Sequence, residues 1–355
     1  MSIRISFEEI NVEGYERVVS LRCPNSGLNA IISIHNTNLG PSLGGIRALN
    51  YQSFQEALDD VLKLSKGMTY KAAISGMETG GGKSVIILEE NQILTNELLK
   101  DFAKGVDFLK GRYICAEDMG VDCSSVEIIR SFTDYVVGLE KISGDPARFT
   151  SYGVYLGMRT VAGKLWGSNC LKEKTVAIQG LGAVGMRLAE RLFWSGANLI
   201  VSDISEKKVA DAVKYFGAKA VDVDDILYVD CDILAPCARG GVFHTDNVKY
   251  LSCKSIVGAA NNQLDSEIVG DRLFEAGIVY APDYLVNSGG LINVAQELNS
   301  SGYNSQVVRE KTWCISDKLD LILQSSEERQ LPPVKIANQM AEESFLRSHA
   351  SSAAN

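Results

Sequence analysis

The chain has 355 residues, 46% of them hydrophobic and 22% charged, an ordinary globular composition in a chain longer than one core usually organises. Its formal net charge of -9 disfavours nucleic acid and anionic membranes as partners, because a negative field repels phosphate. We find no signal pattern at the N-terminus, no apolar run long enough to span a bilayer, no CxxC pair and only three histidines. We therefore expect a cytoplasmic protein of two domains, with free thiols and no metal site.

The first half of the chain alternates strand-like and helix-like segments. Three apolar segments predict strands, at residues 30–35, 84–88 and 112–116. Ser53 and Glu56 are spaced as a capping box and predict a helix that stops at Gly67. Thr95 can cap a second helix, which Gly111 would end. This alternation predicts an open α/β sheet.

The turn at Gly144–Pro146 interrupts this pattern, and we place the domain boundary there. The first domain would span residues 1–145 and the second residues 146–332, while the C-terminal segment 333–355 would pack back onto the first domain. A cleft between two α/β domains is a common place for a cofactor and a substrate to meet.

The second half repeats the α/β alternation. A predicted helix at residues 152–166 precedes five apolar segments that predict strands, at residues 175–179, 198–202, 232–235, 255–257 and 278–280. Two further helices are predicted at residues 305–323 and 333–346. The order again favours an open α/β sheet.

A glycine motif follows the first strand of this second series. The sequence TVAIQGLGAVG contains Gly180, Gly182 and Gly185 as GxGxxG, directly after an apolar strand and at the start of a helix. These glycines allow a tight turn, close approach of a pyrophosphate and close packing of helix on strand, and the helix N-terminus attracts phosphate. A simple tight turn is the alternative. The predicted dinucleotide loop comprises Gly180, Leu181, Gly182, Ala183, Val184, Gly185 and Met186.

The residue after the next strand indicates which dinucleotide binds. The strand NLIVS ends at Asp203, at the spacing where a carboxylate holds the adenine-ribose hydroxyls. Its charge would repel a 2′-phosphate, so we predict NAD. Lys207 and Lys208 lie just beyond, where they would serve NADP or simply begin a solvated helix.

Residues 76–84, GMETGGGKS, resemble a phosphate-binding loop but fail its spacing. That motif needs four residues between its first glycine and the final GK. The required glycine would fall on Met77, and Gly76 is one place too early. We instead expect Gly80–Gly82 to bring the backbone close to a ligand and to deliver Lys83 to the following strand.

Two motifs bring lysines near each other in the sequence, KGMTYK at residues 66–71 and GGGK at residues 80–83. A charged lysine can hold a carboxylate, whereas a buried lysine beside another positive charge has a lowered pKa and can act as a neutral base. Lys71 and Lys83 are therefore candidates for an anchoring cation and a general base. A solvated surface charge is the usual alternative for a lysine, and the motif settings argue against it here.

Together with GPSLGGIR at residues 40–47, AEDMG at 116–120 and NSGGLINV at 287–294, these motifs resemble the glutamate/leucine/phenylalanine/valine dehydrogenase family. The match is collinear from Gly40 to Val294, with the dinucleotide motif in its place. The leucine dehydrogenase branch is most similar, through KGMTYK, AEDMG, AANNQL at 259–264 and YAPDYLVNSGG at 280–290.

The resemblance implies the fold and the activity. The fold would be two α/β domains across a cleft, the first for substrate binding and oligomerisation and the second a Rossmann domain. The enzyme would convert an apolar, branched-chain L-amino acid reversibly into its 2-oxo acid and ammonia with NAD, as a homo-oligomer.

The resemblance also implies roles for single residues. Lys71 matches the lysine that binds the substrate α-carboxylate, Lys83 the catalytic lysine, and Asp118 the aspartate that relays protons. The backbone of Gly44 and Gly45 would lie beside the substrate.

Further matches lie in the second half of the chain. Asn287 matches a substrate-contacting asparagine, and Thr150 a residue near the nicotinamide carboxamide. Asn261 is assigned to the cofactor. Arg47, after the double glycine, is as well suited to a structural anchor as to a substrate ligand.

The substrate side chain would contact four positions. Leu43 stands where the glutamate-specific branch has a lysine, and leucine cannot stabilise a second buried carboxylate. The remaining pocket residues by resemblance are Ala116, Leu291 and Val294. Ala116 is typical of leucine dehydrogenases, whereas Leu291 is typical of the phenylalanine branch. We expect a pocket for Leu, Ile or Val that is tight for Phe.

Other functions stay open at this point. A phenylalanine or valine dehydrogenase would share the family motifs, and a non-catalytic NAD-binding regulator would share the fold. The complete set of Lys71, Lys83 and Asp118 argues against the regulator. A 2-hydroxy-acid dehydrogenase typically needs a histidine base, and no histidine here lies in a glycine-rich setting.

Overall fold

The computed structural model describes residues 5–352, with the side chains of residues 5–346. It divides into two compact units. The first holds the chain up to Gly144, together with Val294–Tyr303 and the chain from Ala341 onward. The second holds Asp145–Asn293 and Asn304–Met340.

The first unit is built on a mixed sheet of six strands in the order β1-β2-β3-β5-β4-β6. The strands are β1 (Ser6–Glu9), β2 (Arg17–Cys23), β3 (Leu28–Asn36), β4 (Ser42–Leu49), β5 (Gly80–Ile87) and β6 (Tyr113–Glu117). β4 is parallel to both β5 and β6, whereas β1, β2, β3 and β5 pair in antiparallel fashion. The predicted strands are β3, β5 and β6. The other three were not foreseen, and β4 carries a double glycine that weakens any strand pattern.

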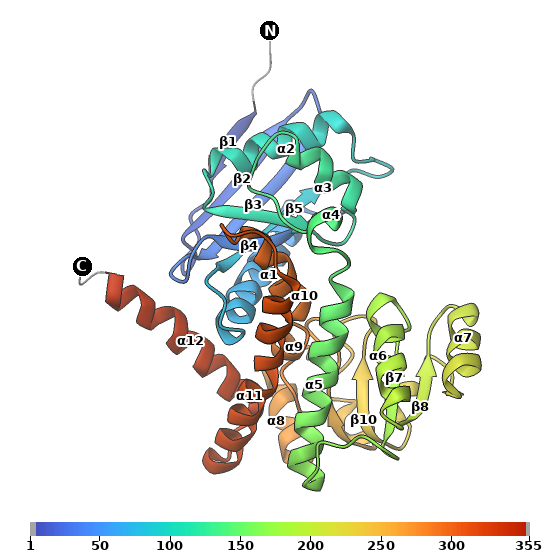
Figure 1. Ribbon diagram of the computed structural model, residues 1–355. Helices are drawn as coiled ribbons and strands as arrows, with labels where there is room; N and C mark the ends of the chain where they lie inside the picture. Colours follow the sequence, from blue (N-terminus) through green and yellow to red (C-terminus); the bar gives the residue numbers. More distant parts are fainter. Residues whose placement is uncertain (1–4, 353–355) are drawn as a thin grey trace. The chain divides into compact units, whose positions relative to one another are not determined.

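Helices cover both faces of this sheet (Figure 1). They are α1 (Phe54–Ile74), α2 (Asn96–Phe108), α3 (Cys123–Arg130) and α4 (Glu140–Ser143). Ala57 and Val61 of α1 pack on Val85 of β5, while α2 and α3 cover the opposite face. The predicted caps are confirmed: the Ser53 side chain accepts a hydrogen bond from the amide of Glu56, and α2 begins in the same way at Thr95. α2 ends at Phe108, before the predicted stop at Gly111.

The prediction that Gly67 ends the first helix is wrong. α1 continues to Ile74, with Ser75 as its C-cap residue. Gly76, which has φ 68°, follows directly. A glycine inside a helix costs only about 1 kcal/mol relative to alanine, and the packing of α1 along β3 and β5 outweighs that cost. The extension places Lys71 in the last turn of α1.

The second unit holds a six-stranded parallel sheet in the order β12-β11-β10-β7-β8-β9. Its strands are β7 (Thr175–Gln179), β8 (Asn198–Ser202), β9 (Lys219–Ala220), β10 (Cys231–Pro236), β11 (Cys253–Ile256) and β12 (Val279–Tyr280). In chain order this is 6-5-4-1-2-3, the strand order of a Rossmann fold. The predicted Rossmann unit is confirmed, and only the two-residue edge strand β9 was not foreseen.

The helices of the second unit begin with α5 (Ala147–Trp166), which starts five residues before the predicted position. The others are α6 (Ala183–Trp194), α7 (Glu206–Phe216), α8 (Glu267–Glu275), α9 (Asp283–Val286), α10 (Gly289–Ala295), α11 (Ser305–Arg329) and α12 (Pro333–Ser352). The last residues of α10 and α12 belong to the first unit. α5 packs against both α6 and α11 (Figure 1).

The C-terminal part of α12 contacts β3 and α1 of the first unit. The Phe345 ring lies 6.5 Å from the ring of His35 and 5.7 Å from that of Tyr70. Asn38 donates a hydrogen bond to the backbone carbonyl of Phe345, and Tyr70 donates one to Glu342. These contacts join the end of α12 to the helix that carries Lys71.

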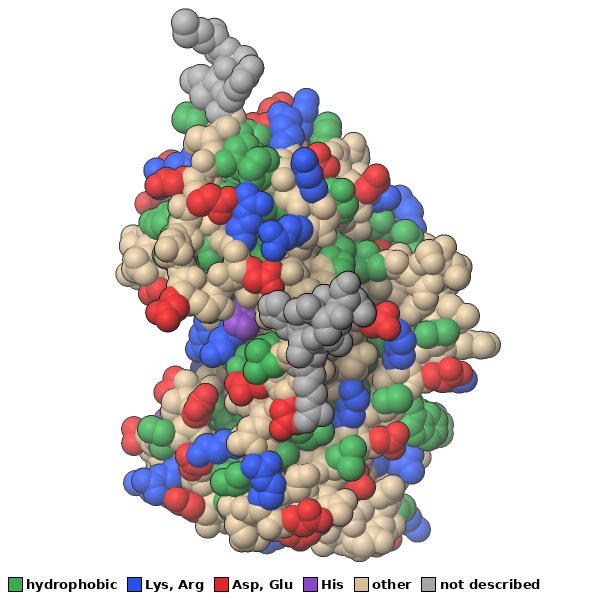
Figure 2. Space-filling view, turned by 90° about the vertical axis from the view of Figure 1, so that its left-hand side faces the viewer, with side chains coloured by type: hydrophobic (Ala, Val, Ile, Leu, Met, Phe, Trp, Pro, Cys, Tyr) green, Lys and Arg blue, Asp and Glu red, His purple; other side chains and the backbone are tan. Residues whose placement is uncertain are grey.

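Charged side chains are mixed on the surface. Figure 2 shows Lys and Arg interspersed with Asp and Glu on the viewed face. The net charge of -9 is therefore not gathered into one patch there. Among the helices of residues 5–352, none has the length and apolar character needed to cross a membrane.

Candidate active site

Three neighbouring parallel strands bring the catalytic candidates of the first unit together. β4 lies between β5 and β6, with Gly45 paired to Ala116 of β6. Lys83 lies on β5, and Asp118 follows the end of β6. A Cβ atom added to Gly45 would lie 2.7 Å from the Cβ of Asp118 and 3.1 Å from the Nζ of Lys83. Gly45 is therefore a glycine because the lysine and the aspartate occupy the space where its side chain would be.

Lys83 and Asp118 form a largely buried ion pair. The Lys83 Nζ lies 2.8 Å from the Asp118 Oδ2, and Lys83 is only 5% exposed. Burial lowers the pKa of Lys83, and the nearby Arg47 charge lowers it further. The attraction of Asp118 raises this pKa but offsets only part of the decrease. Burial alone would raise the pKa of Asp118, but the Lys83 and Arg47 charges hold it below its usual value. The pair thus combines a lysine that loses its proton more readily than a solvated lysine with an ionised carboxylate.

Arg47 is an anchor within the protein. Its Nε donates to the Asp118 Oδ2 at 3.0 Å, and its Nη1 donates to the two oxygens of Asp60 at 3.1 and 3.3 Å. The hydroxyl of Tyr51 donates to Asp60 at 2.7 Å. The sequence leaves the role of Arg47 open and does not indicate Asp60 or Tyr51. The available signal was weak: Asp60 lies three residues after the buried Ala57 and so near the sheet-facing side of α1.

The glycines before Lys83 form a strand and not a loop. A Cβ atom on Gly81 would lie 2.1 Å from the amide nitrogen of Thr69 in α1, and one on Gly80 would lie 2.0 Å from the carbonyl oxygen of Asn36. A Cβ atom on Gly44 of β4 would lie 1.7 Å from the carbonyl oxygen of Gly82. On the side where a Cβ atom would lie, neighbouring protein atoms therefore occupy the space at these glycines.

The contact between Gly81 and Thr69 also relates the two candidate lysines. Thr69 is two residues before Lys71, and Gly81 is two residues before Lys83. The two backbone segments that carry Lys71 and Lys83 therefore touch, and Lys71 is itself half-buried. The carbonyl of Gly44 accepts a hydrogen bond from Tyr113 at 2.9 Å, which ties the double glycine to β6.

Several predicted pocket residues of the first unit lie near one another. Leu43 is 1% exposed and Ala116 is 8% exposed. A Cβ atom on Gly138 would lie 3.7 Å from the Cβ of Ala116 and 3.8 Å from Cγ1 of Val294. The amide of Gly138 donates to the Glu297 carboxylate at 3.1 Å, so this glutamate holds the loop against both side chains. Gly138 and Glu297 were not predicted. Leu291, three positions before Val294 on α10, is half-buried in the second unit.

The GxGxxG loop of the second unit has the geometry of a dinucleotide site. Gly180 has φ 93°, which only glycine adopts easily, and a Cβ atom on Gly185 would lie 1.9 Å from the Gly180 carbonyl oxygen. Gly182 precedes α6, and a Cβ atom there would meet nothing within 4 Å. No side chain of the described residues caps this helix start. Open space beside uncapped amides fits a pyrophosphate.

Asp203 follows β8 and lies beside this loop. Its Oδ2 accepts a hydrogen bond from the amide of Leu181 at 2.6 Å, and its Oδ1 accepts one from Ser205 at 2.8 Å. Each carboxylate oxygen keeps a second lone pair for another donor. Asp203 is thereby oriented next to the glycine loop, where a ribose hydroxyl could donate to it.

The structure brings two of the predicted asparagines together. The side-chain amide of Asn287 donates to Asn261 at 2.8 Å and to the carbonyl of Ala259 at 3.1 Å. Asn287 is 2% exposed, and its buried Oδ1 has no hydrogen-bond partner among the described residues. A buried acceptor without a partner is costly, and this oxygen is free to accept a hydrogen bond from a bound ligand.

Thr150 lies close to the same segment of the second unit. A Cβ atom on Gly290 would lie 2.6 Å from the Thr150 Oγ1, so the SGG sequence after Asn287 leaves room for this hydroxyl. Thr150 donates to the carbonyl of Pro146 at 3.2 Å.

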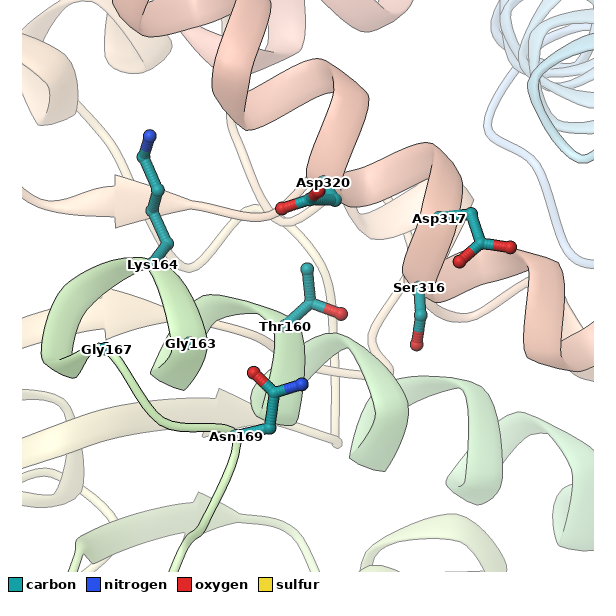
Figure 3. A pocket seen from close by; sticks show the side chains of 8 residues that line it. All are labelled: Thr160, Gly163, Lys164, Gly167, Asn169, Ser316, Asp317 and Asp320. Carbon is teal, nitrogen blue, oxygen red and sulfur yellow. The ribbon is translucent and has the colours of Figure 1, made fainter.

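A separate groove of about 490 Å³ lies at the end of α5, also in the second unit (Figure 3). Side chains of α5 and α11 face it together with Asn169, as Figure 3 shows. Among the described residues that line it, none was predicted to bind substrate or cofactor. The groove is therefore distinct from both candidate sites.

Family models match the two halves of the chain. Residues 15–135 match the Glu/Leu/Phe/Val dehydrogenase dimerisation domain, and residues 143–351 match Glutamate/Leucine/Phenylalanine/Valine dehydrogenase. The chain belongs to this family. It is accordingly an amino-acid dehydrogenase, and the resemblance found in the sequence is confirmed. The alternative of a non-catalytic regulator is not favoured.

Individual members of the family are similar over almost the whole chain. Leucine dehydrogenase from Bacillus subtilis (strain 168) is 44% identical over 96% of this chain and 94% of the relative. Phenylalanine dehydrogenase from Caldalkalibacillus thermarum (strain TA2.A1) is 42% identical over 96% and 93%. The crystal structure of L-tryptophan dehydrogenase from Nostoc punctiforme matches with a TM-score of 0.84 and 38% identity, covering 95% of this chain and 97% of that one. The fold is therefore that of the amino-acid dehydrogenases.

Proposed function

We propose that the protein catalyses the reversible, NAD-dependent oxidative deamination of a branched-chain L-amino acid such as leucine to its 2-oxo acid and ammonia. The observation that carries this proposal is the buried pair of Lys83 and Asp118, with Nζ and Oδ2 2.8 Å apart. A lysine with a lowered pKa beside an ionised carboxylate suits a reaction that removes protons from an ammonium group and from water.

Three residues of the first unit have defined tasks in this proposal. Lys71 holds the substrate α-carboxylate. Once hydride loss has made the α-carbon an iminium carbon, the neutral Lys83 amine takes a proton from the water that adds to that carbon. Asp118 keeps Lys83 in place through their 2.8 Å contact and relays protons to and from the substrate nitrogen. NAD, when bound, would supply the acceptor for the hydride that leaves the α-carbon.

The dinucleotide residues fit NAD. The open helix start after Gly182 would hold the pyrophosphate, and Asp203 would accept hydrogen bonds from the adenine ribose. Thr150, Asn261 and Asn287 would face the nicotinamide end of the site, where the free Oδ1 of Asn287 offers an acceptor to an amide or ammonium group.

The substrate preference rests on Leu43 and Ala116. Leu43 replaces the lysine expected in a glutamate-specific enzyme and is fully buried, so a second carboxylate would have no counter-charge there. Ala116 and Val294 lie around Gly138 and would limit the space for a large side chain. A pocket for Leu, Ile or Val follows.

Initial rates of NADH formation with Leu, Ile, Val, Phe, Trp and Glu test this proposal directly. We expect kcat/KM to be highest for a branched-chain substrate and far lower for glutamate. A value for glutamate equal to that for leucine would contradict the role of Leu43. A preference for Phe or Trp would instead assign the chain to an aromatic-specific branch.

We further propose a cytoplasmic homo-oligomer in which the domain of residues 1–145 carries both substrate and subunit contacts. The match to a dimerisation domain and the eight free cysteines support this. Analytical ultracentrifugation would test the assembly, and a monomer at micromolar concentration would refute it.

A further inference from the structure

One oxygen of Asp118 receives two cations. Oδ2 accepts from the Lys83 Nζ at 2.8 Å and from the Arg47 Nε at 3.0 Å. Within the described part of the chain, no hydrogen bond is made to Oδ1. The two cations therefore fix the orientation of the carboxylate and leave its other oxygen for a substrate or a water molecule.

Arg47 is in turn held from a different element. Its Nη1 lies 3.1 Å from the Asp60 Oδ2 on α1, and the Tyr51 hydroxyl donates to that same oxygen at 2.7 Å. The side chains of Arg47 and Asp60 are 19% and 27% exposed, so water screens this ion pair less than a surface pair. A planar guanidinium that bridges two carboxylates from separate elements has little freedom to rotate.

We propose that Arg47 is a positioning residue for the Lys83–Asp118 pair, and that Asp60 and Tyr51 hold Arg47 in the orientation this requires. The proposal rests on the proposed function of Lys83 and Asp118 and deepens it. Arg47 acts through Asp118 and does not itself contact the substrate.

The chain of charges acts on Lys83 with alternating sign. Apart from burial, the charged groups with the largest effects on the pKa of Lys83 are Asp118 after β6, Arg47 on β4 and Asp60 on α1. Arg47 lowers this pKa, whereas Asp118 and Asp60 raise it. Removing the Arg47 charge should therefore raise the pKa of Lys83, and removing the Asp60 charge should lower it. If Arg47 and Asp60 only stabilised the fold, their removal would not shift the pKa of Lys83 in opposite directions.

The test compares Arg47→Gln, Arg47→Lys, Asp60→Asn and Tyr51→Phe with the wild type. The first readout is the pH profile of kcat/KM for the best amino acid, whose acidic limb reports the protonation of Lys83. The second is competitive acetylation of the Lys83 amine at several pH values, quantified by mass spectrometry, which gives its pKa without any need for activity. Arg112→Gln, which removes an exposed arginine–glutamate pair of the same unit, is the matched control.

We expect Arg47→Gln to move the acidic limb and the acetylation midpoint to higher pH, and Asp60→Asn to move both to lower pH. Arg47→Lys keeps the positive charge but loses the planar guanidinium that bridges Asp118 and Asp60. The pH profile of this variant should therefore stay near that of the wild type while its kcat falls. A misplacement of the pair by about 1 Å costs roughly 100-fold in rate. Tyr51→Phe should lower kcat less, because it removes one hydrogen bond and no charge. Arg112→Gln should match the wild type in every readout.

Each result decides the proposal. Opposite shifts for Arg47→Gln and Asp60→Asn support it. Shifts in the same direction, or unchanged profiles with unchanged kcat in both variants, overturn it. If Arg47→Gln does not fold, the nearly isosteric Asp60→Asn still tests the expected shift of the Lys83 pKa to lower values. Tyr51→Phe then still tests the expected decrease in kcat. If the wild type oxidises no amino acid, the proposed function fails, and the acetylation midpoints still decide whether Arg47 and Asp60 control Lys83.

Discussion

Replacing Gly81 by alanine should push α1 away from β5. The added Cβ would lie 2.1 Å from the amide nitrogen of Thr69 and 2.5 Å from its Cα, far inside van der Waals contact. Both residues are buried, and the atoms in the way belong to backbone, so a side-chain rotation cannot relieve the overlap. The helix must move by roughly 1 Å in a region packed like a crystal. That movement would separate the segments that carry Lys71 and Lys83.

The size of the effect follows from these contacts. Overpacking a well-filled core costs about 1–3 kcal/mol, and a domain of this size loses roughly 2–4 °C in Tm for each kcal/mol. A displacement of roughly 1 Å at a reacting group costs on the order of 100-fold in rate. We therefore expect Gly81→Ala to lower the Tm by several degrees and to lower kcat/KM about 100-fold.

Gly67→Ala is the matched control, because it makes the same chemical change on α1. A Cβ atom on Gly67 would meet nothing within 4 Å. Alanine inside a helix is favoured over glycine by about 1 kcal/mol, so the Tm should rise by a few degrees and kcat/KM should not change. Differential scanning calorimetry and initial-rate kinetics on both variants measure these values. A Gly81→Ala protein with the stability and kcat/KM of the wild type would refute the steric argument.

Other expected outcomes concern catalysis, the cofactor and the pocket. Lys83→Ala should lose about 10²–10⁴-fold in kcat and still bind NADH, as measured by turnover and by fluorescence titration; near-normal kcat would overturn its role as the base. Lys71→Ala should chiefly raise the KM for the amino acid, because it removes a contact present in both ground and transition states, and an unchanged KM would count against it. Asp203→Ser should bring the kcat/KM values measured with NAD and with NADP closer together. A wild type that already uses both cofactors equally would contradict the role of Asp203. Ala116→Gly should raise kcat/KM for phenylalanine relative to leucine by roughly 10-fold or more, since one methyl group in a pocket changes discrimination by about 1–3 kcal/mol; an unchanged ratio would remove Ala116 from the pocket wall.

Local sequence signals were sufficient to predict much of the second unit and the start of two helices in the first. The strands β7 and β8 lie at the predicted residues, and the GxGxxG loop has the tight turn and close helix packing that its glycines predict. The helix caps at Ser53 and Thr95 formed as the sequence indicated. Such features depend on backbone preferences and hydrogen bonds between residues close in the chain, so a short window of sequence contains their cause.

Tertiary packing decided the rest. Gly67 did not end α1, because contacts with β3 and β5 stabilise the helix beyond it. The role of Arg47 was ambiguous in the sequence, because its two partners are distant in the chain. Asp60 lies on α1 and Asp118 follows β6. Only the pairing of β4 with β6 and the packing of α1 bring these carboxylates to Arg47. The sequence named Lys83 and Asp118 as candidates through their motifs, but the distance between them and the burial that lowers the pKa of Lys83 depend on segments far apart in the chain.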